Sequence, residues 1–211
     1  MNIGILGSGE VAQALAKGFL QRGDVVMLGT RDAAKLKDWR AASGQRASVG
    51  SFAETAQFGE WVVIATLGTA AEDAVAQAGP QHFAGKIVID STNPLRFDGG
   101  VVSLAYCDPS NGERIASALP GARVVKAFNT VGNPLMVHPD FHGPRGVMFL
   151  AGNDGEAKAA VAKLCEEWGW NASDMGGIEA SRYLEAMCIV WVRYCAASQQ
   201  WNSAFTFVTA N

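Results

Sequence analysis

The sequence predicts a doubly wound α/β fold, with a mostly parallel sheet and a small C-terminal helical lobe. Short apolar segments, such as 61–65, alternate with amphipathic helical segments over the first 130 residues or so. These apolar segments are continuous, as in strands that are buried on both faces of a parallel sheet. Short loops join them, which favours right-handed crossovers between neighbouring parallel strands.

The first strand, turn, helix and strand form one unit. Asn2–Leu6 is the first strand, and the helix that follows runs to about Gly23 before a second strand, 25–28. The turn between them has the pattern G-x-G-x-x-A, in which the first glycine permits a sharp turn and the second lets a pyrophosphate approach the backbone. Free amides at a helix N-terminus favour phosphate. The unit therefore predicts a Rossmann-type dinucleotide site at Gly7, Ser8, Gly9, Glu10 and Val11.

The end of the second strand favours NADP over NAD. Thr30 and Arg31 stand there and Lys35 follows one turn later, where an NAD site usually carries a carboxylate for the ribose. A guanidinium suits the 2′-phosphate of NADP. In the alternative interpretation Arg31 and Lys35 are solvated surface charges and Asp32 is the ribose acid, but Asp32 fits a helix N-cap better.

The remaining elements of the first lobe follow the same alternation. We expect helices at about 33–40, 51–58, 70–78 and 113–119, and strands at 47–49, 61–65, 86–90 and 123–127. Polar or turn residues follow three of these strands, at the sheet edge where open α/β folds bind ligands. These residues are Thr66, Leu67, Asn93, Pro94, Asn129 and Thr130. Each could also be a plain turn or cap residue, and Asn93-Pro94 is a good turn by itself.

Segment 96–111 has no periodic pattern and is rich in Gly, Asp, Pro and Ser, so it is either a lid beside the site or a surface loop. Residues 1–132 are predicted to bind NADP. Residues 133–211 are predicted to form a C-terminal lobe, with strands at 147–151 and 170–174, helices at 154–168 and 180–198, and an apolar tail. Such an apolar helix and tail predict a homodimer interface. The competing interpretation is a tail folded back on its own sheet.

Composition excludes several classes of protein. The net charge of −3 gives no reason to expect nucleic acid or an anionic membrane as partner, and the longest apolar run, 186–192, is too short to span a bilayer. The four cysteines form no C-x-x-C pair, which favours free thiols in a reducing compartment. With no cleavable leader recognisable, we expect a cytoplasmic protein. His138 and His142 flank Pro139 and lack a completing ligand set, so no metal site is expected.

No acid–base or nucleophilic constellation is evident in the sequence. Hydride transfer needs none, because it depends mainly on holding the donor and acceptor carbons about 3–3.5 Å apart. The sequence therefore favours an oxidoreductase whose catalytic residues stay unassigned, with Asn93, Pro94, Asn129 and Thr130 as candidates on the acceptor side.

Taken together, the segments G-S-G-E-V-A, G-T-R, D-S-T-N-P-L, V-V-K-A-F-N-T, G-N-D-G-E-A-K and E-A-S-R-Y-L-E resemble the family of NADPH-dependent coenzyme F-420 (deazaflavin) reductases. The soluble domain of six-transmembrane ferric reductases is similar, and pyrroline-5-carboxylate reductases are more distant. The resemblance implies that Gly7–Val11 line the pyrophosphate and that Thr30, Arg31 and Lys35 hold the 2′-phosphate. It also implies that Asn93, Pro94, Ala127 and Asn129 border the nicotinamide.

The resemblance implies an NADPH-dependent oxidoreductase with a flavin or deazaflavin (coenzyme F-420) acceptor. Asn129 departs from the family's His, and K-A-F-N-T is closer to the ferric reductase domain. Two alternatives remain: an imine or ketone reductase with Thr130 or Tyr183 as proton donor, and a non-catalytic NADP sensor. The last helix resembles the family's dimer and acceptor-side element, and the sequence leaves open whether its Ser181, Arg182 and Glu185 are functional.

Overall fold

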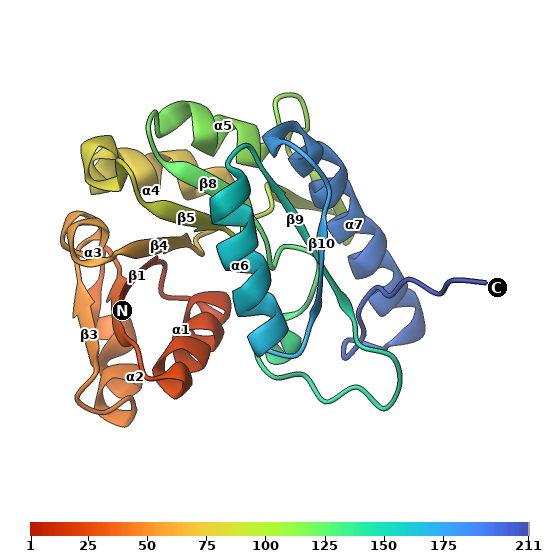
Figure 1. Cartoon of the computed structure of the whole chain (residues 1–211), viewed down its shortest axis with the longest axis horizontal. Coiled ribbons are helices and arrows are strands. Elements are labelled where there is room, and N and C mark those ends of the chain that lie inside the picture. Colours follow the sequence, from red (N-terminus) through yellow and green to blue (C-terminus); the bar gives the residue numbers. More distant parts are fainter. Residues whose placement is uncertain (211) are drawn as a thin grey trace.

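The computed structural model describes residues 1–210 and contains an eight-stranded sheet with helices on both faces (Figure 1). The strand order is β10-β9-β8-β5-β4-β1-β2-β3. The strands of this sheet are β1 (Asn2–Leu6), β2 (Val25–Gly29), β3 (Ala47–Gly50), β4 (Trp61–Ile64), β5 (Ile87–Asp90), β8 (Arg123–Lys126), β9 (Val147–Gly152) and β10 (Asn171–Asp174). All neighbours are parallel except β8 and β9, so the predicted mostly parallel, doubly wound sheet is confirmed.

The helices divide between the two faces of the sheet because successive side chains of a strand point to opposite faces. The helices are α1 (Glu10–Arg22), α2 (Lys37–Ala42), α3 (Phe52–Phe58), α4 (Ala71–Ala78), α5 (Asn111–Ala118), α6 (Gly155–Glu167) and α7 (Ser181–Ser198). α1 and α6 share one hydrophobic core, where Phe19 meets Trp168 edge to face at 5.0 Å. α3, α4 and α5 share the core on the other face, and α7 covers β9.

The chain reverses its direction of strand addition between β1 and β4. From β1 the chain adds β2 and β3 on one side, and β4 then adds on the other side. The connections on the two sides diverge, which leaves a crevice at the carboxyl ends of these strands. This topological switch point positions the site described below.

One predicted loop is partly wrong. Segment 96–111 contains a two-stranded antiparallel hairpin, β6 (Leu95–Asp98) and β7 (Val101–Leu104), in place of an irregular excursion. Gly99 and Gly100 form its turn with φ of 54° and 83°, a backbone region that glycine enters without steric cost. The rest of the segment, 105–110, contains no helix or strand.

The C-terminal strands do not form a sheet of their own. β9 and β10 extend the first sheet, and α6 packs in the same core as α1. The tail folds back on the sheet: the Val147 amide donates to the Phe205 carbonyl at 2.8 Å, and the Phe149 ring meets Phe205 and Phe207 edge to face. Within one chain, the tail therefore follows the competing interpretation, in which it folds back on its own sheet. The division of the chain at residue 132 stays a prediction.

Candidate nucleotide-binding site

A cavity of about 680 Å³ opens at the switch point, beyond the carboxyl ends of β1, β2, β4 and β5. The four connections that follow these strands meet there. The residues from the sequence prediction that line it are Gly7, Ser8, Gly9, Glu10, Val11, Thr30, Arg31, Lys35, Thr66, Leu67 and Asn93. Pro94, Ala127, Asn129 and Thr130 are buried and do not line the cavity.

The glycine turn after β1 combines two different geometries. Gly7 has φ of 139°, its amide donates to the Gly29 carbonyl at 2.9 Å, and a β-carbon there would collide with the Ala65 carbonyl. Gly9 has an ordinary φ of −79°, and a β-carbon there would meet no atom within 4 Å. The open space beside Gly9 fits the close approach of a ligand, since nothing in the protein requires glycine at that position.

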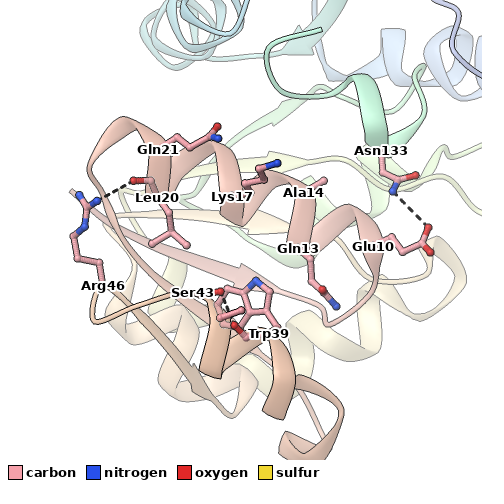
Figure 2. A pocket seen from close by; sticks show the side chains of 11 residues that line it. Glu10, Gln13, Ala14, Lys17, Leu20, Gln21, Trp39, Ser43, Arg46 and Asn133 are labelled. Carbon is pink, nitrogen blue, oxygen red and sulfur yellow. Dashed lines mark hydrogen bonds between the residues drawn. The ribbon is translucent and has the colours of Figure 1, made fainter.

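The N-terminus of α1 faces the cavity without a side-chain cap, because its N-cap residue is Gly9. Uncapped amides and the helix dipole favour an anion there. The Glu10 carboxylate turns away from this point and approaches the Asn133 amide at 3.5 Å (Figure 2). A second cavity, of about 860 Å³, lies on that side of α1 and is bounded by α2 and Asn133. The negative side chain in the motif therefore does not oppose phosphate at the turn.

Among the residues after β2, one side chain caps a helical turn and two are cations that have no ion-pair partner within residues 1–210. Asp32 caps the 3-10 turn 33–36 by accepting from the Ala34 amide at 3.1 Å, which confirms the N-cap interpretation. The Thr30 hydroxyl accepts from the Asp32 amide at 3.1 Å. Within residues 1–210, neither Arg31 nor Lys35 forms a salt bridge. Both are exposed at the rim of the cavity, so both are available to an anionic ligand.

At the opposite end of the cavity, the loops after β4 and β5 lie in close contact. A β-carbon on Gly68 would collide with the backbone of Asn93, and Leu67 beside it is 79% exposed. Asn93 is tied to Asn129 in both directions: its side-chain amide donates to the Asn129 carbonyl at 2.7 Å and accepts from the Asn129 side chain at 2.9 Å. Asn129 therefore does not line the cavity itself but is hydrogen-bonded to Asn93, which does.

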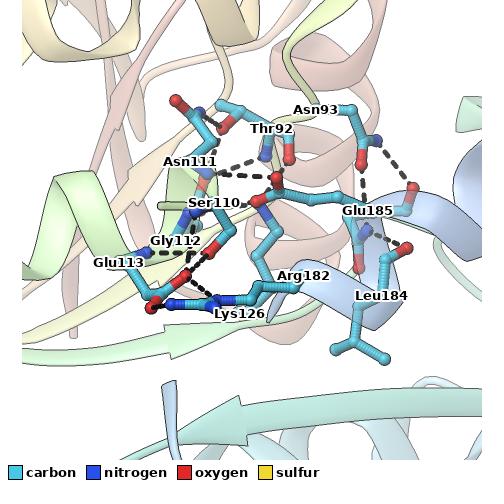
Figure 3. A network of polar contacts seen from close by, with 12 residues as sticks. Thr92, Asn93, Ser110, Asn111, Gly112, Glu113, Lys126, Arg182, Leu184 and Glu185 are labelled. Atoms are coloured by element: carbon cyan, nitrogen blue, oxygen red, sulfur yellow. Dashed lines mark hydrogen bonds and ion pairs between the residues drawn. The ribbon is translucent and has the colours of Figure 1, made fainter. Parts of the chain in front are cut away.

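A buried charge network behind this wall was missed in the sequence. Lys126 forms ion pairs with Asp90 at 2.8 Å and with Glu185 at 2.7 Å, and all three side chains are fully buried (Figure 3). Burial alone would lower the pKa of Lys126, but the two carboxylates raise it above its ordinary value, so the ammonium stays charged. The signal in the sequence was a charged residue at the end of each of two apolar strands, Asp90 and Lys126. In the sheet these two residues are register partners.

The histidine, cysteine and tyrosine side chains of the described residues lie outside the cavity. Of the described residues that line it, none is His, Cys or Tyr. Cys165, Cys188 and Cys195 are buried free thiols, and desolvation raises the pKa of Cys188 to about 12. Tyr183 is exposed on α7. Residues 1–210 contain no group of three His, Cys, Asp or Glu side chains suited to a metal ion.

Comparison with known proteins identifies the family. Residues 2–94 match the family described as "NADP oxidoreductase coenzyme F420-dependent". The chain is 30% identical over 200 residues to the F420-dependent NADP reductase of Methanothermobacter marburgensis, covering 88% of each protein. The chain belongs to this family of F420-dependent NADP oxidoreductases. The predicted resemblance and the predicted class of NADP-dependent oxidoreductase are thereby confirmed.

Two further relatives of this NADP oxidoreductase are informative. The crystal structure of a putative F420-dependent NADP-reductase from Arthrobacter sp. FB24 is 35% identical, with a TM-score of 0.92 over 98% of this chain and 99% of that one. The metalloreductase STEAP3 of Rattus norvegicus is 29% identical over 88% of this chain, which spans only 36% of that relative's length. No helix in residues 1–210 has the length and hydropathy to cross a membrane. A reductive aminase from Aspergillus terreus, at 22% identity, and two imine reductases, at 18%, show similarity of the fold alone.

Proposed function

We propose that this oxidoreductase transfers hydride between NADP(H) and a flavin or deazaflavin acceptor, with coenzyme F420 as the favoured acceptor. The observation that carries the NADP part is the rim of the cavity after β2, where Arg31 and Lys35 have no ion-pair partner within residues 1–210 while Asp32 is used as a cap. The two relatives named as F420-dependent NADP reductases support the choice of acceptor.

The proposed binding mode uses both ends of the cavity. The pyrophosphate lies on the Gly7–Gly9 turn and on the amides of α1. The 2′-phosphate lies against Thr30, Arg31 and Lys35. The nicotinamide extends toward Thr66, Leu67 and Asn93, with Pro94, Ala127, Asn129 and Thr130 supporting it from behind. When bound, NADPH supplies the hydride.

This chain's contribution to the reaction is positioning. Reduction of an imine or ketone requires a proton donor near the acceptor, but Thr130 is buried outside the cavity and Tyr183 is exposed on α7. Reduction of a flavin-like ring by hydride requires no such proton donor, so it is compatible with a cavity that is lined by no His, Cys or Tyr. The apolar side chains of Leu67, Leu95 and Phe97 border the same end and suit a flat aromatic acceptor.

Replacing Arg31 by Glu tests the phosphate assignment. A charge-assisted hydrogen bond contributes about 1.5–3 kcal/mol, so R31E should weaken NADPH binding at least about tenfold and leave NADH binding nearly unchanged. Titration calorimetry with both nucleotides measures this difference. Lys37→Glu is the matched control, because Lys37 is exposed nearby but does not line the cavity. Equal weakening of NADPH and NADH in R31E would refute the assignment.

The acceptor is tested by mixing NADPH with FMN, coenzyme F420, a quinone and a ferric chelate and following the loss of NADPH absorbance. Oxidation by F420 or FMN is the expected result. NADPH binding without oxidation by any member of the panel would instead support a non-catalytic NADP sensor.

A homodimer is the proposed assembly. The buried face of α7 packs on β9, yet its outward face carries a second apolar stripe. This α7 stripe consists of Tyr183, Ala186, Val190, Tyr194 and Ala197, all exposed. A helix that is apolar on both faces is typical of a buried element, so a second copy of the chain is the partner we propose. We also propose a cytoplasmic location, which the free cysteines support.

A further inference from the structure

The ion cluster behind the cavity wall is connected to the wall itself (Figure 3). The Lys126 ammonium has three N–H donors, and each has a partner: Asp90 at 2.8 Å, Glu185 at 2.7 Å and the Thr92 backbone carbonyl at 2.6 Å. Thr92 lines the cavity and immediately precedes Asn93. The cluster therefore fixes the backbone at the end where we place the nicotinamide.

The backbone amide and the hydroxyl of Thr92 are hydrogen-bonded as well. Its amide and its hydroxyl both donate to the same Asp90 oxygen, at 2.9 and 2.6 Å, and its hydroxyl accepts from the Asn111 side chain at 2.5 Å. This stretch follows β5 and belongs to no helix or strand. Side chains therefore supply the constraint that a strand ladder would otherwise provide.

Two consecutive residues of α7, Leu184 and Glu185, are linked by hydrogen bonds to the two wall residues, Thr92 and Asn93. The Glu185 carboxylate binds Lys126 and accepts from the Asn111 and Gly112 amides, each at 3.0 Å. The preceding carbonyl, that of Leu184, accepts from the Asn129 side chain at 2.9 Å, and this side chain also donates to Asn93. Glu185 thus reaches Thr92 through Lys126, and Leu184 reaches Asn93 through Asn129.

Stability alone gives no reason to keep such a cluster. Burying ions costs several kcal/mol each, and well-packed apolar residues often replace a buried ion pair without loss of stability. We propose that Lys126 and Glu185 are positioning residues for hydride transfer, because they hold Thr92 and Asn93 in the geometry that places the nicotinamide. This inference rests on the proposed function, and it makes α7 part of the reaction geometry although no residue of α7 lines the cavity.

Glu185→Gln tests the proposal, with Arg182→Gln as its matched control. Arg182 also joins α7 to α5, through Glu113 at 2.6 and 2.8 Å, but its ion pairs within the described residues are with Glu113 and Asp108 and not with the Lys126 cluster. Stopped-flow measurement of the hydride step should show a loss of about 10- to 100-fold in E185Q, since small displacements of reacting groups have effects of this size. The dissociation constant for NADPH should change less than about threefold, because the phosphates bind elsewhere. R182Q should lower stability only.

A second variant keeps the test decisive if E185Q does not fold, even though its Lys126 ammonium keeps the ion pair with Asp90. Lys126→Met combined with Glu185→Gln removes the ammonium and one carboxylate. Asp90 keeps its hydrogen bonds from the Thr92 amide and hydroxyl and can take up a proton, so the variant should fold as judged by thermal melting without cofactor. Its hydride step should remain slow. A wild-type rate in this double variant, a double variant that does not fold, or an equal effect in E185Q and R182Q would overturn the inference alone. A wild-type protein that transfers no hydride to any acceptor would overturn the proposed function with it.

Discussion

Gly7 and Gly9 belong to one motif, but the physical reason for having glycine differs between the two positions. Gly7 adopts a left-handed backbone and has no room for a β-carbon. Gly9 adopts an ordinary backbone and faces open space, so its lack of a side chain benefits only a ligand.

Alanine substitutions should separate these two reasons. Gly7→Ala should destabilise the cofactor-free protein by more than about 2 kcal/mol, because it adds a strained φ and a collision with a backbone carbonyl. Gly9→Ala should leave that stability nearly unchanged and weaken NADPH binding tenfold or more. Thermal melting and NADPH titration measure the two effects. Tight NADPH binding by Gly9→Ala would contradict the placement of the pyrophosphate.

Single residues differ in how well the sequence predicts them. Asp32 was assigned correctly as a cap, because capping depends on a partner two residues away. The role of Lys126 was missed, because its partners Asp90 and Glu185 are distant in the chain and only the folded sheet brings them together. Local chemistry is visible in a sequence, whereas the pairing of buried charges requires the tertiary structure.

At the scale of elements, periodicity predicted the long helices and the buried strands, and short exposed strands were the difficult case. β6 and β7 have four residues each, with three exposed residues in β6 and a single buried one in β7, so they give little hydrophobic signal. The sequence Asp98-Gly99-Gly100-Val101 was nevertheless a usable hairpin indication, because glycine pairs favour the tight turns of hairpins. The fold-back of the tail was one of two open interpretations, since an apolar tail does not specify what it packs against.

The link between α5 and α7 predicts a pH dependence of stability. Hydrogen bonds from Arg182, with those from Ser110, outweigh desolvation and lower the pKa of Glu113 from 4.5 to about 2. Between these values the unfolded chain binds more protons than the folded one, so this contribution to stability is present above about pH 4.5 and is lost as the pH falls toward 2. The melting temperatures of wild type and Arg182→Gln should therefore differ at pH 6 and converge toward pH 3. A difference that stays constant over this range would contradict the assignment.

At the scale of the whole molecule, the outward face of α7 is the feature that one chain leaves unexplained. Tyr183 is 71% exposed, Val190 57% and Tyr194 55%, while the opposite face of the same helix is buried against β9. A contiguous apolar surface of this kind marks an interaction site on most soluble proteins. In a two-fold dimer, the same stripe would supply both sides of the contact.

Val190→Lys should break this assembly. The substitution places a charge at the centre of the α7 stripe, where burial against a second copy would leave it without a partner, so the variant should be monomeric at concentrations where the wild type is a dimer. Sedimentation velocity measures the masses. Ala159→Lys on α6 is the control, because Ala159 is exposed and outside the α7 stripe, and it should remain dimeric. A monomeric wild type, or a V190K dimer as tight as the wild type, would show that the stripe does not join two chains.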